Sequence, residues 1–277
     1  MKDVKYLVDT TLRDGEQSPG YALTKEQKVE IAAMLDIAGV YQIEAGIPAI
    51  CSYEIDTLCE ISQNKHSSKI SVWNRLNEDD IKRSFDCNPD IIHIGVPVSY
   101  IQIYTKLHKN KTWIAKTAAR CADMAMSKGY EVTVGFEDAS RADPAFMLAL
   151  AYSLKSIGVN RIRFADTVGV LSPTRTYETI RDLIGFTGIE VEMHAHNDLG
   201  MAVANSLAAA KAGANYIDTT IFGIGERTGN CDFKKFISAS EFAFTVSPTH
   251  SAALKVEEKA AKILVRERKD GYYEKKM

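Results

Sequence analysis

Eight short apolar runs, each followed by a longer segment with helical periodicity, constrain the fold of this chain more than any other feature. The runs are rich in β-branched residues and lie at 5–11, 41–47, 69–73, 90–96, 131–137, 160–166, 189–196 and 215–223. Helical patterns follow near 24–39, 53–64, 78–85, 112–128, 143–157, 173–184, 202–212 and 233–244. In the first pattern, Thr24 is the predicted N-cap and Gly39 the predicted stop. The units lack sequence similarity to one another, which excludes a solenoid of repeated motifs.

Strands that are apolar on both faces and alternate with helices indicate a parallel sheet covered by helices. Eight such units in about 250 residues are what a closed (β/α)8 TIM barrel requires. A doubly wound open sheet is the alternative, but the chain reads DTTLRDGEQ after the first run, without the G-x-G-x-x-G turn of that fold. We therefore predict an α/β protein with a TIM barrel at 1–246 and a helical tail or truncated subdomain at 247–277.

Composition limits the classes of function. The chain has 277 residues, of which 45% are hydrophobic and 25% charged, as in ordinary globular proteins. Its 34 basic and 36 acidic residues leave no bias towards nucleic acid or an anionic membrane. The five cysteines form no C-x-x-C pair, and no run has the character of a signal core or membrane span. These features predict a cytoplasmic protein that binds neither nucleic acid nor membrane.

Polar residues concentrate at the carboxyl ends of the predicted strands, which meet at one mouth of a barrel. The opposite ends show no comparable concentration, and a buried charge is costly unless it is paired or ligated. We therefore expect the functional site at this mouth. The residues concerned are Asp9, Thr10, Thr11, Arg13, Asp14, Glu16, Gln17, Glu44, His93, Glu137, Asp138, Asp166, Thr167, His194, His196, Asn197 and Asp198.

His194 and His196 lie two positions apart on a predicted strand, so their imidazoles point to the same side. For an isolated H-x-H, ordinary hydrogen bonding of a core and a rim histidine is the simpler explanation. Here the last strand of the barrel closes against the first, which brings Asp14 and Asn230 to the same place. Two imidazoles and a carboxylate that leave open positions are typical of a catalytic divalent-metal site. This context favours a metal, although the ligands suit Mg, Mn, Zn or Fe alike.

Three glycines precede Asn230, at positions 223, 225 and 229. Their spacing is similar to that of a phosphate-binding loop, but no lysine follows them as in a P-loop. A tight turn that carries Asn230 inward explains them better. Cys231 is interpreted as a small buried residue and not as a ligand.

Three separated motifs resemble the signatures of the DRE-TIM metallolyase superfamily. They are DTTLRDGEQSPG at 9–20, HAHNDLGMAVANSLAAAKAGA at 194–214 and GIGERTGNCD at 223–232. Within the superfamily, the resemblance is to the acyl-CoA condensing branch of isopropylmalate, citramalate and homocitrate synthases, and it covers about residues 3–245. The segments IEAGIPA, GFEDASRADP and RFADTVGVL are most similar to those of nitrogenase-associated homocitrate synthases.

The resemblance implies a Claisen condensation of acetyl-CoA with a 2-oxo acid, which releases CoA. 2-Oxoglutarate, giving homocitrate, is the first choice of oxo acid. The resemblance also implies a divalent metal ion that binds the oxo acid and polarises its carbonyl group. Asp14, His194 and His196 would be the metal ligands, with Asn230 in or near the coordination sphere.

The same resemblance implies roles for six further positions. Arg13 would hydrogen-bond the keto oxygen, where negative charge develops, and Gln17 would orient the ligand shell. Glu137 would either help acetyl-CoA to enolise or support a neighbouring ligand or Arg13. The substrate-binding set would be completed by Glu44, His93 and Thr167, although His93 could equally be a satisfied histidine of the barrel core.

The chain departs from this family pattern in two ways. Homocitrate synthases of lysine biosynthesis have an arginine for the distal carboxylate where this chain has Thr133, so the oxo acid stays open among 2-oxoglutarate, oxaloacetate, pyruvate and 2-oxoisovalerate. Members of the branch also continue beyond the barrel into subdomains with a catalytic histidine and tyrosine. We therefore expect a second subunit, or a homodimer partner, to supply those groups, as in clostridial-type synthases divided into alpha and omega subunits.

Other functions stay open at this point. The chain could have isopropylmalate, citramalate or Re-type citrate synthase activity. It could also be a metal-dependent hydroxyacyl-CoA lyase or retro-aldolase, because stabilising an enolate serves both directions of C–C bond chemistry. A non-catalytic partner subunit is the alternative from a different class, and retention of every proposed ligand argues against it.

Overall fold

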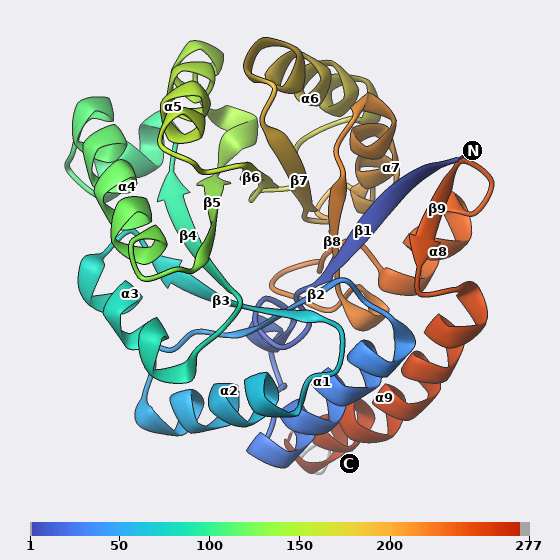
Figure 1. The fold of residues 1–277 in the computed structure, drawn as a ribbon. Helices are drawn as coiled ribbons and strands as arrows, with labels where there is room; N and C mark the ends of the chain where they lie inside the picture. Colours follow the sequence, from blue (N-terminus) through green and yellow to red (C-terminus); the bar gives the residue numbers. More distant parts are fainter. Residues whose placement is uncertain (1, 272–277) are drawn as a thin grey trace.

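The computed structural model describes residues 2–271, with side chains described up to 264, and its eight central strands form a closed parallel barrel surrounded by helices (Figure 1). The strands are β1 (Asp3–Asp9), β2 (Gln42–Gly46), β3 (Lys69–Arg75), β4 (Ile91–Pro97), β5 (Glu131–Glu137), β6 (Arg161–Asp166), β7 (Glu190–Ala195) and β8 (Tyr216–Thr219). Pairing runs in order from β2 to β8 and then to β1, which also pairs with β2 and so closes the ring. The predicted TIM barrel is confirmed.

A helix follows each strand and covers the outside of the barrel (Figure 1). These helices are α1 (Lys25–Ala38), α2 (Ser52–Asn64), α3 (Glu78–Ser84), α4 (Lys111–Met126), α5 (Pro144–Ser156), α6 (Pro173–Thr187), α7 (Ala202–Ala212) and α8 (Phe233–Ser240). The caps of α1 are as predicted: Thr24 and Gln27 form a reciprocal capping box, and Gly39 ends the helix with a left-handed φ of 89°.

The prediction that the strands are apolar on both faces is wrong. Their outward residues are apolar and pack against the helices, whereas charged side chains meet inside the barrel. Arg163, which is only 1% exposed, bonds across the interior to Glu44 of β2 at 2.7 Å and to Glu192 of β7 at 2.5 Å. Each of these charges is stable in the interior because it has an oppositely charged partner.

The opposite mouth of the barrel is also polar, contrary to the prediction that charge is concentrated at one end only. Arg161, at the start of β6, donates to Gln42 at 2.8 Å and lies 3.3 Å from Glu192 and 3.6 Å from Glu131. Its guanidinium also stacks over the ring of Tyr216, 4.1 Å from the centroid. These contacts fill the amino-terminal end of the barrel with paired groups.

The chain after α8 differs from the predicted helix to 244. The helix ends at Ser240, and a ninth strand, β9 (Phe244–Ser247), pairs in parallel with the first half of β1. The boundary predicted at 246 falls inside β9. The tail that follows contains the helix α9 (His250–Gly271), while residues 272–277 of the predicted tail lie outside the described residues.

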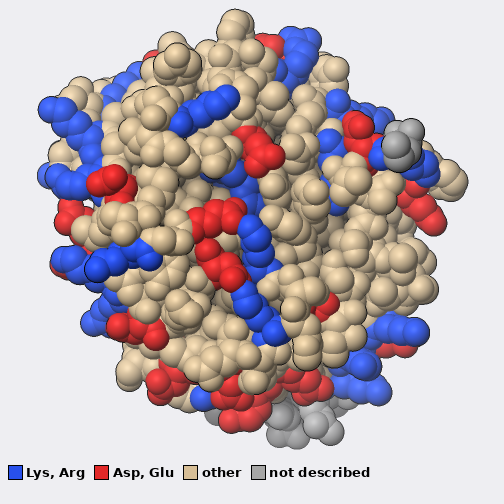
Figure 2. Space-filling view, in the orientation of Figure 1, with Lys and Arg blue, Asp and Glu red and all other residues tan. Residues whose placement is uncertain are grey.

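The tail helix α9 packs on the outside of the barrel against α1 and α8 (Figure 1). Its apolar face is buried, and that face comprises Val256, Ala260, Ile263 and Leu264. Acidic and basic side chains are interspersed over the face of the molecule in Figure 2, in keeping with the net charge of −2. Over the range 2–271, no helix combines the length and the apolar character needed to cross a membrane.

Asp36, in the last turn of α1, holds the segment that leads into β3. Its Oδ1 accepts hydrogen bonds from the backbone N–H of Ser67 at 2.9 Å and of Ser68 at 2.7 Å, and its Oδ2 accepts one from the N–H of His66. Burial alone would raise the pKa of this carboxyl, but the three N–H donors outweigh it and lower the pKa to about 2. The charged form of Asp36 therefore stabilises the folded state.

We expect Asp36→Asn to lower the free energy of unfolding by about 2–3 kcal/mol at pH 7. Because the folded pKa lies below the ordinary value, this contribution is complete above about pH 4 and is lost as the pH falls towards 2. Urea unfolding at pH 7 and pH 3 should therefore show a wild-type-to-variant gap that narrows at the lower pH. Asp56→Asn, at an exposed position of α2, is the control. An equal gap at both pH values would contradict the assignment.

Candidate active site

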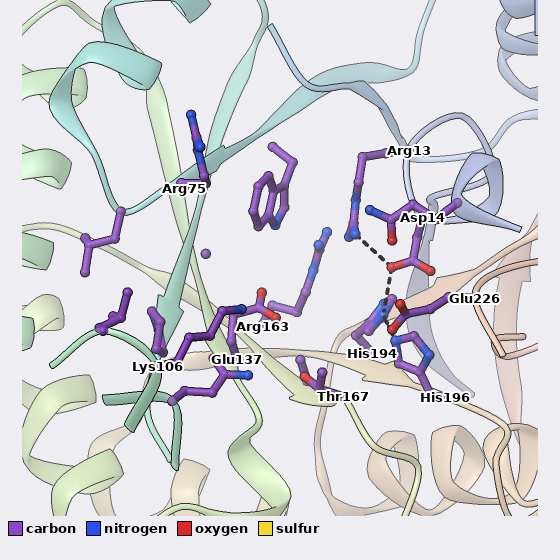
Figure 3. Close-up of a pocket in the computed structure, with 18 of the residues that line it drawn as sticks. Arg13, Asp14, Arg75, Lys106, Glu137, Arg163, Thr167, His194, His196 and Glu226 are labelled. Carbon is purple, nitrogen blue, oxygen red and sulfur yellow. Dashed lines mark hydrogen bonds and ion pairs between the residues drawn. The ribbon is translucent and has the colours of Figure 1, made fainter. Parts of the chain in front are cut away.

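A cavity of about 530 Å3 opens at the carboxyl-terminal mouth of the barrel, where a site was predicted. This volume is in the usual range for a small-molecule site, roughly 300–1,000 Å3. Figure 3 shows Asp14, His194, His196 and Glu226 on one side of the cavity and Arg75 and Lys106 on the other. The residues that line it include Arg13, Asp14, Gln17, Trp73, Arg75, Gly95, Lys106, Trp113, Glu137, Arg163, Thr167, His194, His196 and Glu226.

The three predicted metal ligands come together in this cavity. One ligand atom from each of Asp14, His194 and His196 lies within 4.8 Å of the others, and all three residues are buried. The Nε2 atoms of the two histidines are 3.2 Å apart, and Nε2 of His194 is 3.5 Å from Oδ2 of Asp14. Two imidazole nitrogens and one carboxylate oxygen converge at this point. The contacts between them are not all bridged by a proton, so the three atoms form a possible metal site.

The loop after β8 carries Asn230 to this group. Asn230 pairs with His196 in an isolated β-bridge, and its amide donates to Oδ1 of Asp14 at 2.8 Å. Gly229 has a φ of 87°, and a Cβ there would lie 2.0 Å from the carbonyl oxygen of Gly223. A Cβ on Gly225 would lie 2.2 Å from the Asn230 amide nitrogen. The glycines therefore make the tight inward turn that the sequence predicted.

Asn230 has an oxygen left for a ligand. Its amide nitrogen donates to both Asp14 and the carbonyl of Ile224, which fixes the orientation of the side-chain amide. Its Oδ1 is buried and has no hydrogen-bond partner in the described part of the chain. A cation held by Asp14, His194 and His196 would give this buried oxygen a partner.

Cys231, next to Asn230, is also buried. Burial raises its pKa to about 12, so the thiol stays neutral, in keeping with a structural role.

Asp218 of β8 is a further residue of the site, and the sequence analysis missed it. Its Oδ2 lies 2.9 Å from Nδ1 of His194 and 3.0 Å from Nε of Arg163. A proton on Nδ1 of His194 that is donated to Asp218 leaves Nε2 of that imidazole free to bind a metal. Two features of the sequence could have identified Asp218. It is an acidic residue within the apolar run YIDTT, and any such barrel pairs the strand that contains it with the strand that contains His194.

The protonation of the two histidines fits this interpretation. Burial lowers the pKa of His194, but hydrogen bonds to Asp14 and Asp218 outweigh burial and raise it to about 9. Burial and the repulsion from His194 lower the pKa of His196 to about 3. The pair therefore carries at most one positive charge at neutral pH, because two imidazolium ions cannot face each other at this distance. A divalent cation between the nitrogens would replace the extra proton that carries this charge.

Arg13 enters the cavity from the loop after β1 and is held by two carboxylates. It donates to Asp14 at 2.7 Å and forms an ion pair with Glu44, while its guanidinium lies 5.8 Å from the ring of Trp73. Glu44 is completely buried and is not among the lining residues, because Arg13 and Arg163 cover it. Burial would raise the pKa of Glu44, but the two guanidinium groups outweigh burial and lower it. Glu44 therefore positions Arg13, and its predicted contact with substrate stays untested.

Glu137, at the end of β5, lines the cavity without an ion-pair partner among the described residues. Burial raises its pKa, although Arg13 and His194 act in the opposite direction. Its Oε1 occupies space left by two glycines, since a Cβ on Gly95 or Gly135 would lie 3.3 Å from that oxygen. Glu137 is therefore a carboxyl group with raised basicity inside the pocket.

Of the remaining predicted site residues, Thr167 and Gln17 lie at the cavity surface and His93 lies deeper in the barrel. Thr167 and Gln17 line the cavity, and the hydroxyl of Thr167 accepts a hydrogen bond from the backbone N–H of Asp138. His93 lies below the cavity, where its Nδ1 is 2.7 Å from the hydroxyl of Thr133. Burial lowers the pKa of His93 to about 3, so this imidazole is neutral. His93 is thus buried in the barrel core, but its Nε2 has no hydrogen-bond partner among the described residues, so the choice between a substrate contact and a core histidine stays a prediction.

The chain matches the model of the HMGL-like family over residues 5–257. It belongs to that family. Homocitrate synthase subunit alpha of Clostridium pasteurianum is 49% identical over 231 residues, which cover 83% of this chain and 86% of the relative. Homocitrate synthase 1 of a Nostoc species is 45% identical over 83% of this chain, and 2-isopropylmalate synthase 2 of Caldanaerobacter subterraneus is 40% identical over 86%.

These relatives differ in length from the chain. Its matched part spans 61% of the Nostoc protein and 62% of the Caldanaerobacter protein, in contrast to 86% of the clostridial subunit. Among solved structures, a hydroxymethylglutaryl-CoA lyase of Pseudomonas aeruginosa superimposes with a TM-score of 0.82 at 17% identity, over 95% of this chain and 93% of that one. That similarity supports the barrel fold.

We expect His196→Ala to abolish divalent-metal binding, because it removes one of two imidazole ligands without disturbing a strand interior. Calorimetric titration with Mn2+ and Zn2+ measures the loss, and circular dichroism checks that the fold is retained. His66→Ala, at an exposed position, serves as the control and should bind as the wild type does. Undiminished binding by the His196 variant would remove the metal site proposed here.

Asp218→Asn should weaken metal binding about 10- to 100-fold, since a residue that orients a ligand typically contributes that much. The amide can still accept a hydrogen bond, but it no longer stabilises the His194 tautomer by charge. The same titrations test this expectation, with Asp123→Asn on the exposed side of α4 as the control. Equal affinities for wild type and the Asp218 variant would show that Asp218 supports only the fold.

Proposed function

We propose that this protein condenses acetyl-CoA with a 2-oxo acid and releases CoA, with 2-oxoglutarate as the oxo acid and homocitrate as the product. The observation that carries the proposal is the convergence of Asp14, His194 and His196 beside Arg13 and Glu137 in one cavity. Relatives named as homocitrate synthases at 45–49% identity support the reaction type and the product.

The proposed cofactor is a divalent cation held by Asp14, His194 and His196, with Asn230 beside them. When bound, it would act as a Lewis acid on the 2-oxo acid. The buried carboxylates of Asp14 and Asp218 lie on either side of His194, and negative charge at this place fits a positively charged ligand. Gln17 and Thr167 line the same cavity and are proposed to orient the ligand shell and the substrate carboxylate, respectively.

Arg13 is proposed to stabilise the charge that forms on the keto oxygen. In the condensation, the acetyl-CoA methyl group loses a proton to a base, its carbon bonds to the keto carbon, and the electron pair of the C=O bond moves to oxygen, which takes up a proton. A guanidinium fixed by Asp14 and Glu44 needs no reorganisation to meet that oxygen, which is the condition for effective electrostatic catalysis. Water then hydrolyses the thioester and releases CoA.

Glu137 is proposed to assist removal of the methyl proton. Burial raises its pKa, and a carboxylate with a raised pKa is a better base near neutral pH. The thioester methyl is a weak acid, so one carboxylate is a modest base for it. Further proton-transfer groups are proposed to come from a second polypeptide or a second copy of the chain.

A second subunit is proposed on the lengths of the relatives. The clostridial relative is named as an alpha subunit and is matched over 86% of its length, whereas a homocitrate synthase with no subunit in its name is matched over 61%. The additional part of the longer relative would correspond to the second polypeptide. The isopropylmalate synthase relative keeps 2-oxoisovalerate among the substrates to be tested.

A panel of 2-oxo acids with acetyl-CoA tests the proposed reaction, with release of free thiol as the measurement and Mg2+ or Mn2+ present. We expect thiol release only with an oxo acid and fastest with 2-oxoglutarate, and we expect the chain to need a second subunit for full activity. The panel should include oxaloacetate, pyruvate and 2-oxoisovalerate. Cleavage of a hydroxyacyl-CoA without any condensation would identify a lyase instead. Full turnover by the purified chain as a monomer would rule out the split arrangement.

A further inference from the structure

Four basic side chains line the cavity, and three of them already have acidic partners. Arg13 pairs with Asp14 and Glu44, and Arg163 pairs with Glu44, Glu192 and Asp218. Arg75 holds Asp80 with two hydrogen bonds of 2.6 and 2.9 Å. The fourth is Lys106, for which the described residues provide no ion pair or side-chain hydrogen bond. Lys106 is exposed at the edge of the cavity, so among the described lining residues it is the basic side chain that is free to meet an anionic ligand there.

Lys106 is carried on a well-anchored segment. It ends the single π-helical turn η3 (Ile101–Lys106), which follows β4. Ile103 in this turn is completely buried, and its backbone N–H bonds to the carbonyl of Ser99 at 3.0 Å. The backbone N–H of Leu107 bonds back to Gln102 at 3.0 Å, which closes the wide turn. The backbone of Lys106 is thus fixed beside the cavity, and irregular turns of this kind are frequent at functional sites.

The position of Lys106 relative to the metal group suggests what it binds. Figure 3 shows Lys106 directed into the cavity from one side, with Asp14, His194 and His196 on the other. A ligand that reaches both sides needs a metal-binding end and an anionic end. A dicarboxylic 2-oxo acid has this form, whereas a monocarboxylic one would place an apolar end against an ammonium group and strip its water.

We propose that Lys106 is the specificity residue that binds the second carboxylate of a dicarboxylic 2-oxo acid. This inference rests on the proposed condensing function and adds the element that selects the substrate. Thr133 lies in the core, where its hydroxyl bonds to His93, and it offers no positive charge to the second carboxylate. Lys106 would supply that charge from another part of the cavity. A hydrogen bond between an ammonium group and a carboxylate is stronger than one between neutral partners.

Binding can be measured without turnover, because the chain has two tryptophans and both line the cavity. Trp73 and Trp113 make intrinsic fluorescence a direct probe of occupancy. The full chain in Mg2+ would be titrated with 2-oxoglutarate and with 2-oxopentanoate, which has the same carbon chain but lacks the second carboxylate. Acetyl-CoA would be titrated separately, because its phosphates are the other anions that an ammonium group at the cavity could bind.

We expect wild type to prefer 2-oxoglutarate, and Lys106→Met to raise the Kd for 2-oxoglutarate about 10- to 100-fold. The Kd for 2-oxopentanoate should stay the same or fall, because its apolar end no longer dehydrates an ammonium group, and the Kd for acetyl-CoA should not change. Lys106→Arg should restore most of the preference, because it keeps the cation. Lys116→Met, on the exposed side of α4, should match wild type for all three ligands.

Three results with Lys106→Met would overturn the inference about Lys106. The first is a variant that still binds 2-oxoglutarate more tightly than 2-oxopentanoate, and the second is an equal rise in the Kd values of both oxo acids. The third is a rise in the Kd of acetyl-CoA alone, which would assign the cation to the coenzyme phosphates. A wild-type preference for 2-oxopentanoate would likewise overturn it, because the apolar lining would then receive the far end of the substrate. The proposed condensing function fails separately, if wild type with Mg2+ binds neither oxo acid.

Discussion

The ion pairs of Arg163 are the interaction on which the rest of the site depends. This side chain crosses the barrel interior from β6 and contacts carboxylates on β2, β7 and β8, namely Glu44, Glu192 and Asp218. A buried ion costs several kcal/mol in lost hydration unless its partners compensate it, so each of these charges is stable only in the presence of the others. TIM barrels usually fill this layer with branched aliphatic residues, which would not link the strands by charge.

Two of the Arg163 partners also hold residues of the cavity. Glu44 forms an ion pair with Arg13, and Asp218 contacts Nδ1 of His194 at 2.9 Å. The electrostatic centre of the barrel is therefore continuous with the site at its mouth. A functional group placed in this way is held by strands and not by mobile loops, which is the arrangement that keeps reacting groups preorganised. The same coupling predicts that changes at Arg163 affect fold and site together.

More of the candidate site than of the barrel interior could be predicted from the sequence. The turn glycines, the H-x-H pair and the acidic residue after the first strand have fixed local geometry, so Asp14, His194, His196 and Asn230 could be placed from the sequence. The charged interior was missed, although RIRFAD and EVEMHAH alternate charged and apolar residues. That alternation describes strands with an apolar face towards the helices and a charged face towards the barrel axis. The charged face was not predicted because the strands were expected to be apolar on both faces.

By itself, the sequence determined the eightfold alternation, the ends of α1, the family motifs and the meeting of Asp14, His194, His196 and Asn230 at one place, because these depend on neighbours within a few residues or on one closure of the barrel. Only the tertiary structure decided which charges are paired. Arg163 and Glu44 are 119 positions apart, and Asn230 and Asp14 are 216 positions apart. Pairing over such separations depends on barrel register and side-chain reach. For that reason Asp218 became visible as the partner of His194, and Lys106 as the unpaired cation of the cavity, only in three dimensions.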